Sequence, residues 1–207
     1  MINLRTYSIL DSLQPQMASF ISTVSKGFLP VADQACCVIE IAPGIEINRL
    51  LDVALKKTNV LPGMQVVERS YGMLEIHSDE QGDIRAAGEA ILEEIDQVED
   101  NRMKPKVLTS QLIKNITDHH AQMVNRTRHG HMLLKGDTLY VLEIEPAGYA
   151  FYAANEAEKG ANINLIEVRG IGAFGRVYLG GEEKDIVEAR DIIETKLSEI
   201  SGKESSK

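Results

Sequence analysis

The chain has 207 residues, of which 43% are hydrophobic and 26% are charged. This is the composition of a globular protein, and the length suggests one or two domains. Thirty-one acidic residues against 22 basic ones leave a formal net charge of −9. An acidic chain repels phosphate backbones, which argues against a nucleic acid as partner.

The beginning of the chain, MINLRTYSIL, contains no long apolar segment. No run approaches the ~18 apolar residues that span a bilayer. We therefore expect a cytosolic protein without membrane contact. The only two cysteines, Cys36 and Cys37, are adjacent and lie within the apolar segment ACCVIEI. Adjacent cysteines rarely bridge, so we expect buried thiols.

The first half of the chain predicts alternating strands and helices from its hydrophobic periodicity. Strands are predicted at 4–10, at 35–41 and within 64–77, where two strands are joined by a tight glycine turn. Helices are predicted at 15–25, 46–59 and 82–95. The helix at 15–25 begins with a proline, which suits the first turn.

The sequence overlays itself when it is shifted by 103 positions. VIEIAPG at 38–44 then falls on VLEIEPA at 141–147, and Gly72 falls on Gly175. One residue is expected to drop out after Gly175, since Asp83 later matches Asp185. Such self-similarity predicts two copies of one domain of about 100 residues. We place them at 1–103 and 104–207, around the charged linker EDNRMKPK.

The second copy repeats the same order of elements, from KVLTSQLI at 106–113 to DIVEARDIIETKLSEI at 185–200. Strands alternate with helices, but the hairpin requires some antiparallel pairing. The pattern therefore predicts an α+β fold with helices on one face of a mixed sheet.

A glycine motif in RGIGAFGR has the spacing of a dinucleotide fingerprint, at Gly170, Gly172 and Gly175. That motif requires a helix directly afterwards, whose N-terminus meets the pyrophosphate. Here a β-type run, RVYLGG, follows instead. The glycines are better explained by a compact hairpin in which backbones approach closely.

Four of the five histidines, His119, His120, His129 and His131, lie in one segment. Tracts of this kind can bind metal. However, neighbours on a predicted helix point about 100° apart, and the other two lie in a loop. We favour solvated or interface histidines over a metal site. No nucleophile and base occur at a known motif spacing. We therefore expect that the protein has no cofactor and is not an enzyme.

The segment VVERSYG places a charged pair, Glu68 and Arg69, between two valines and a Tyr-Gly pair. Taken alone, this is a surface ion pair worth ~0–1 kcal/mol. The same segment is one of several that carry a resemblance. The others include LDSLQPQMASF, EPAGYAFYAANEAEKGANI and IGAFGRVYLGGEEKDI.

In these segments the chain closely resembles the tandem-domain shell proteins of carboxysomes, within the bacterial microcompartment shell family. The similarity extends from about residue 4 to about residue 200. It implies two circularly permuted, ferredoxin-like shell domains. It further implies a homotrimer, since two domains per chain give a six-domain ring with threefold symmetry. Such pseudohexamers tile into a protein shell in the bacterial cytoplasm.

The resemblance also assigns a site. Glu68 and Arg69 would gate a central pore that passes small metabolites of carbon fixation. The pore lining would comprise Ser70, Tyr71, Gly72, Ile171, Gly172, Ala173, Phe174 and Gly175. Other shell hexamers, and a second trimer stacked face to face, are implied partners. Two alternatives stay open: a trimeric ferredoxin-like small-molecule sensor or enzyme, and a shell protein of another microcompartment.

Overall fold

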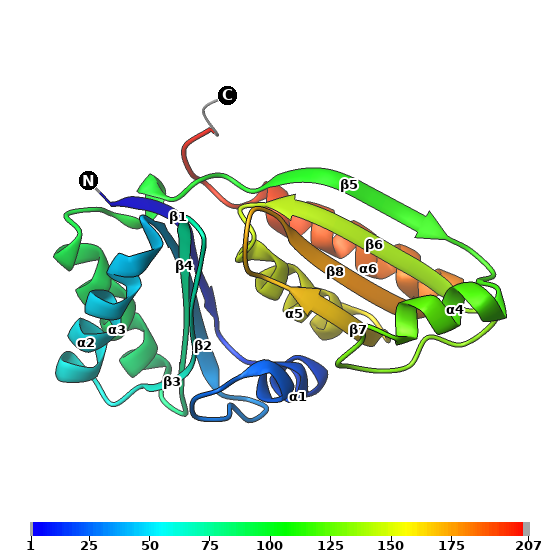
Figure 1. Ribbon diagram of the computed structural model, residues 1–207, viewed down its shortest axis with the longest axis horizontal. Helices are drawn as coiled ribbons and strands as arrows, with labels where there is room; N and C mark the ends of the chain where they lie inside the picture. Colours follow the sequence, from blue (N-terminus) through cyan, green and yellow to red (C-terminus); the bar gives the residue numbers. More distant parts are fainter. Residues whose placement is uncertain (1, 205–207) are drawn as a thin grey trace.

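The computed structural model describes residues 2–204, which form two halves with one four-stranded sheet each (Figure 1). The N-terminal half contains β1 (Asn3–Leu10), α1 (Pro15–Val24), β2 (Ala35–Ala42), η1 (Gly44–Glu46), α2 (Ile47–Lys57), β3 (Leu61–Glu68), β4 (Tyr71–Ser78) and α3 (Gln81–Glu94). The C-terminal half contains β5 (Lys106–Ile113), α4 (Asp118–Asn125), β6 (Thr138–Glu145), α5 (Tyr149–Gly160), β7 (Asn164–Arg169), β8 (Gly175–Gly181) and α6 (Glu183–Ser198). A short helix, η2 (Glu99–Asn101), connects the halves. The predicted strands and helices are confirmed, with ends that differ by a few residues.

The two sheets have equivalent strand orders, β1-β2-β4-β3 and β5-β6-β8-β7. Every strand pair in both sheets is antiparallel, so the prediction of a mixed sheet is wrong. The reason is the strand order. β3 runs in the same direction as β2, but β4 lies between them, so the parallel strands do not pair.

Helices cover both faces of each sheet, whereas the sequence predicts one face. α2 and α3 cover one face of the first sheet, and α1 lies on the other, where Met17 packs in one cluster with Cys36 and Val38. In the second sheet α5 and α6 share a face, while Ala121 of α4 packs with Leu139 on the opposite one. A strand such as β2, apolar at consecutive positions, needs cover on both sides.

One hydrophobic cluster contains residues of both halves. α1 of the first half packs against α5 of the second, as Figure 1 shows, and Phe20 and Phe151 belong to the same buried cluster. The first backbone N–H groups of α1 also find partners in α5. Gln16 N and Met17 N donate to the Glu158 carboxylate at 2.8 and 2.9 Å. A carboxylate from the second half therefore caps a helix of the first.

The register of the sheets locates the missing residue in the repeat more narrowly. Val38 pairs with Glu75 and Val141 pairs with Tyr178, so the shift of 103 persists through β8. The residue is lost after Gly175, as the sequence predicts, in the connection between β8 and α6. A loss inside a paired strand would turn every later side chain to the other face, whereas a connection tolerates it.

Two further expectations concern the chain as a whole. Within residues 2–204, no helix is long and apolar enough to cross a membrane. Cys36 and Cys37 are free and fully buried, and burial raises the pKa of both thiols.

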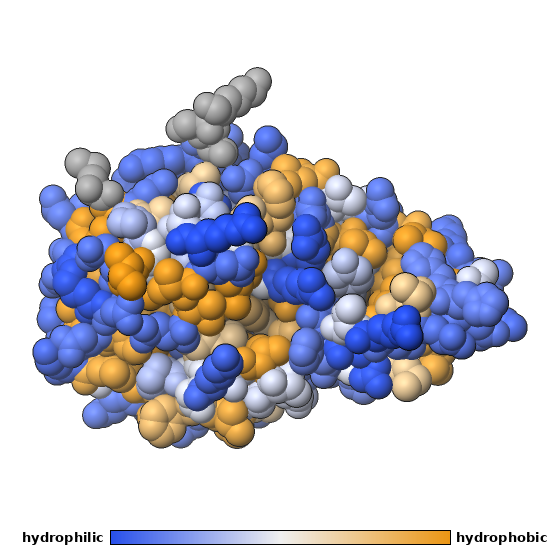
Figure 2. Space-filling model, viewed as in Figure 1, coloured by the Kyte–Doolittle hydropathy of each residue, from blue (hydrophilic) through white to orange (hydrophobic). Residues whose placement is uncertain are grey.

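In the view of Figure 2, polar residues cover the end of the molecule where α4 lies, and apolar residues gather over the N-terminal half.

Candidate functional site: two hairpin turns

The first candidate turn connects β3 to β4. Glu68 ends β3 and pairs with Tyr71, which begins β4, so Arg69 and Ser70 form the turn itself. Arg69 has φ +53°, a left-handed conformation that is uncommon for residues other than glycine. The glycine turn predicted here is therefore wrong, because Gly72 lies inside β4. Glu68, Arg69 and Ser70 are exposed, Tyr71 is half-buried and Gly72 is buried.

Gly72 is required by a close backbone contact. A Cβ atom there would lie 2.9 Å from the Cα and carbonyl carbon of Gly44 and would overlap the Gly44 carbonyl oxygen. Gly44 N in turn donates to Ser70 O at 2.8 Å. Gly175 has the equivalent place in β8, where a Cβ would lie 3.0 Å from Ala147 Cα. The predicted close approach of backbones is confirmed at these positions.

The second candidate turn, 170–174, connects β7 to β8. Gly172 has φ +100°, and Gly170 lies directly against the Phe151 ring. Ala173 and Phe174 are exposed, whereas Ile171 is half-buried. The motif is followed by strand β8 and not by a helix, as the sequence predicts. The helix that a dinucleotide fingerprint requires directly after its glycines therefore does not follow this motif.

The two turns meet within one chain. A Cβ atom at Gly172 would lie 3.3 Å from Glu68 Oε1, so the Glu68 carboxylate lies beside the second turn. Among residues 2–204, no ion pair involves Glu68 or Arg69. The structure thus brings together a predicted gate residue and a predicted lining residue that are distant in the sequence.

A buried ion pair that was not predicted from the sequence supports the first turn. Arg5 Nε donates to Glu40 Oε1 at 2.7 Å, and both side chains are almost fully buried. The guanidinium carbon of Arg5 also lies 3.8 Å from the centroid of the Tyr71 ring. This is the distance of a cation–π contact.

Glu40 also connects the first turn to the second half. Its Oε2 accepts hydrogen bonds from Gly148 N at 2.9 Å and Thr6 Oγ1 at 3.2 Å. Burial raises the pKa of the Glu40 carboxyl, and the bonds from Arg5, Gly148 and Thr6 oppose that rise. The repeat could have pointed to this ion pair. Glu40 matches a glutamate in the second copy, Glu143, whereas its partner Arg5 matches the apolar Leu108, so the arginine is specific to the first copy.

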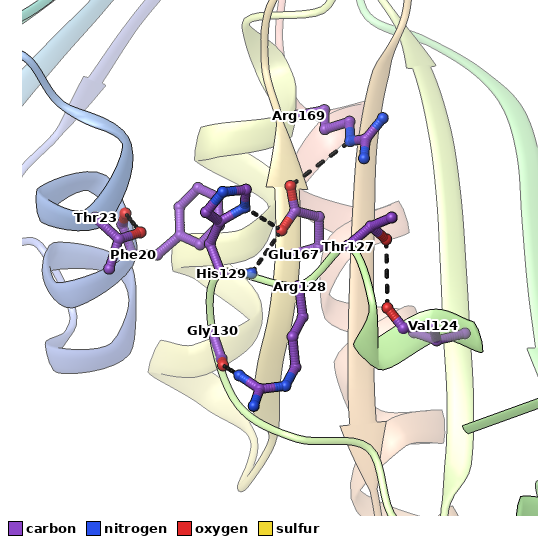
Figure 3. Close-up of polar contacts among 9 residues, drawn as sticks. All are labelled: Phe20, Thr23, Val124, Thr127, Arg128, His129, Gly130, Glu167 and Arg169. Atoms are coloured by element: carbon purple, nitrogen blue, oxygen red, sulfur yellow. Dashed lines mark hydrogen bonds and ion pairs between the residues drawn. The ribbon is translucent and has the colours of Figure 1, made fainter. Parts of the chain in front are cut away.

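The histidine segment forms part of the boundary between the halves (Figure 3). Oε2 of Glu167, on β7, accepts a hydrogen bond from His129 N at 2.9 Å and also lies 2.9 Å from His129 Nδ1. The His129 ring meets Phe20 of α1 edge to face, with centroids 6.3 Å apart. His119 and His120 lie on α4 and His131 lies in the loop, as predicted. In the described part of the chain, no three His, Cys, Asp or Glu residues are placed to hold a metal ion.

Comparison with known proteins decides the family. The carboxysome shell protein CcmP of Synechococcus elongatus is 52% identical over 203 residues, which cover 98% of this chain and 95% of that protein. This chain belongs to the tandem-domain carboxysome shell proteins. A second member, CsoS1D of Hydrogenovibrio crunogenus, is 48% identical over 91% of this chain and 93% of its own. The family model of the CsoS1D N-terminal domain matches residues 4–101.

Solved structures of shell proteins share the whole fold of this family member. The double-ringed trimeric shell protein MSM0271 from the RMM microcompartment is 39% identical, with a TM-score of 0.96 over 99% of this chain and 100% of that one. The fused permuted hexameric shell protein MSM0275 is 44% identical, with a TM-score of 0.94 over 97% and 98% of the two chains. The α+β fold of tandem permuted shell domains is thus confirmed. The protein is a structural carboxysome shell protein of a trimeric family, not an enzyme.

Proposed function

We propose that three copies of this shell protein form a pseudohexameric tile of the carboxysome shell. Its central pore would pass small metabolites of carbon fixation and would be gated by Glu68 and Arg69. The observation that carries the pore is the meeting of two turns, with Glu68 beside Gly172. Turns from successive domains must converge in this way if six domains surround one axis. The relatives among carboxysome proteins favour this compartment over another.

The contact between the halves supplies a template for ring closure. Inside the chain, α5 packs against β1, and Gly148 N donates to Glu40 beside that strand. The equivalent strand β5 leaves Leu108 38% exposed, and Ile45, the equivalent of Gly148, is 65% exposed. Repeating the internal contact between chains would place the η1–α2 region of one subunit on β5 of the next. Three such contacts close a ring with threefold symmetry.

The same reasoning supports domain limits at 1–103 and 104–207. The two sheets contain residues only from their own side of this boundary. Met103 N donates to Arg5 O at 3.1 Å, whereas Arg102 O accepts from Lys203 N and Lys104 N donates to Lys203 O, both at 2.8 Å. The backbone contacts thus change from one half to the other around residues 102–104, which supports a limit in this segment.

Mass measurement tests the ring. Light scattering should give about three times the 22.9 kDa of the chain, or six times if rings stack. An Ile45→Glu variant should shift the mass toward the monomer, because a charge would enter the proposed apolar contact. Val98→Glu is a matched control, since Val98 is 63% exposed but lies outside that contact. A stable monomer across dilution would exclude the pore.

We further propose that two rings stack through the faces that α1 and α4 occupy. The loops after these helices are equivalent in the repeat, and both expose apolar side chains. These are Phe28, Leu29, Val31, Met132 and Leu134. Clustered exposed apolar residues are typical of protein interfaces. Phe28→Ser with Leu134→Ser should convert six-chain particles into three-chain particles, and an unchanged mass would contradict the stacking.

The proposed gating depends on how the charges of Glu68 and Arg69 interact around the threefold axis of the ring. At an effective dielectric of ~20, unit charges 4 Å apart interact by about 4 kcal/mol. Rearranging Glu68 and Arg69 can therefore shift an equilibrium between an open and a closed pore. Replacing both residues with alanine should leave the trimer intact and fix the pore in one state. Crystals of that variant in both open and closed states would show that the pair does not control the gate.

A second variant tests the contact between the Glu68 carboxylate and Gly172. A methyl group at Gly172 would lie 3.3 Å from Glu68 Oε1, so the carboxylate would have to shift by a few tenths of an ångström. Gly136→Ala is the matched control, because Gly136 has a similar φ of +91° but no neighbour within 4 Å of a Cβ. Both variants should lose similar stability through backbone strain. Only Gly172→Ala should change the position of Glu68 in a crystal structure.

A further inference from the structure

A buried arginine lies beneath the turn that carries the proposed gate pair. Tyr71 is the first residue of β4 after the turn, and Arg5 lies on β1, on the other side of β2. The guanidinium carbon of Arg5 is 3.8 Å from the centroid of the Tyr71 ring. One side chain therefore crosses the central strand and contacts the base of the turn.

Arg5 has little freedom at this position. It is 5% exposed, and its Nε donates to Glu40 Oε1 at 2.7 Å. Nη1 lies 3.7 Å from Met103 Sδ, whereas Nη2 is buried and has no hydrogen-bond partner among the described residues. Burying a donor without an acceptor costs free energy, so the packing and the other contacts of the guanidinium must compensate for that cost. The face of the Tyr71 ring offers the negative potential that this group lacks elsewhere.

Glu40 extends this set of contacts to the boundary between the halves. Its second carboxylate oxygen accepts from Gly148 N at 2.9 Å, at the start of α5. A continuous path of contacts thus runs from Gly148 through Glu40 and Arg5 to Tyr71. The path begins at the contact that, in the proposed ring, recurs between subunits.

The second turn lacks the same support. Leu108 stands at the position of Arg5, and Phe174 stands at the position of Tyr71. Glu143, the equivalent of Glu40, is paired instead with Arg176 of β8 at 2.7 Å, and both of these side chains are partly exposed. Among the described residues, a buried arginine therefore lies beneath the turn with Glu68 and Arg69 but not beneath the second turn.

We propose that Arg5 is a positioning residue for the gate. Held between Glu40 and Tyr71, it fixes the base of the Glu68–Arg69 turn to the boundary between the halves. The side chains of Glu68 and Arg69 can then move while the backbone of the turn stays ordered. This inference rests on the proposed gating function, and it adds the element that supports the moving part.

Spin labelling of the turn tests this role. Ser70→Cys gives an exposed attachment point, and the native cysteines are fully buried. Arg5→Lys keeps the charge but loses the planar group that stacks on Tyr71. We expect it to raise the ratio of mobile to immobile nitroxide at position 70 about tenfold, which corresponds to about 1.4 kcal/mol. A label on Ala173→Cys, at the equivalent place in the second turn, should keep its spectrum.

Two control variants separate support of the turn from a general loss of stability. Arg176→Lys alters the equivalent ion pair of the second half and should leave the label at position 70 unchanged. Tyr71→Phe keeps the ring face and should do the same. An unchanged label in Arg5→Lys would overturn the proposal, and so would equal loosening of both turns.

The same labelled protein distinguishes this proposal from the proposed pore. Distances between labels on different chains report whether three turns converge on an axis. If no such distances are found, the ring is wrong, while the local spectrum still reports whether Arg5 orders the turn. If the ring forms and Arg5→Lys leaves the turn ordered, only the role of Arg5 is wrong.

Discussion

Replacing Gly72 with alanine tests how the first turn is held in place. The added methyl group would meet the backbone of Gly44, including its carbonyl oxygen, and backbone atoms cannot turn aside as the end of a flexible side chain can. The backbone conformation of Gly72 is not left-handed, so the perturbation is purely steric. The chain must separate β4 from η1, and the Gly44 N to Ser70 O hydrogen bond of 2.8 Å would then be lost.

The size of the effect follows from two contributions. Overpacking costs about 1–3 kcal/mol, and the lost hydrogen bond costs about 0.5–1.5 kcal/mol. We therefore expect the free energy of unfolding to fall by about 1.5–4.5 kcal/mol. At about 2–4 °C per kcal/mol for a chain of this size, the Tm should fall by about 3–18 °C.

Far-UV circular dichroism is the suitable assay, because the chain has no tryptophan. Protein concentration must be constant, since assembly contributes to the Tm. Gly82→Ala is the matched control. A Cβ at Gly82 meets nothing within 4 Å in the first turn of α3, so its effect should lie between no change and a gain of about 1 kcal/mol. If Gly72→Ala is as stable as Gly82→Ala, the close contact does not constrain the turn.

Three further predictions concern buried groups. In chemical denaturation at neutral pH, Arg5→Met should lower the free energy of unfolding by about 3–5 kcal/mol, because it leaves the buried Glu40 carboxylate without its partner. Adding Glu40→Gln removes that charge and should restore much of the loss. Burial already raises the pKa of Glu40, so the loss in Arg5→Met should shrink as the pH falls below that pKa and the carboxyl becomes protonated; a pH-independent loss would contradict this. Cys36 and Cys37 should react with a thiol reagent only after unfolding, since burial raises both pKa values; rapid modification of the folded protein would refute their burial. Burial raises the pKa of Tyr140 to about 12, so its contribution to stability should be present at neutral pH and disappear as the pH rises through that value, and Tyr140→Phe should lack this component in alkaline titration.

The sequence by itself determined the order of the elements, the internal duplication and the two hairpins, but not which residues form the first turn. These features are local, because the period of apolar residues reports whether a segment is a helix or a strand. The repeat also located Gly72 and Gly175 as equivalent residues. It could not show that Gly72 lies within β4, since its need for glycine comes from Gly44, which is remote along the chain.

Only the tertiary structure decided which elements pack together. The antiparallel pairing throughout both sheets depends on β4 lying between β2 and β3, and no local pattern encodes strand order. The contacts of Glu40 with Arg5 and Gly148 join residues 35 and 108 positions apart. The approach of Glu68 to Gly172 likewise requires the two halves to be docked through α1 and α5. Periodicity specifies which face of an element is buried, whereas the partner of that face depends on how the whole chain packs.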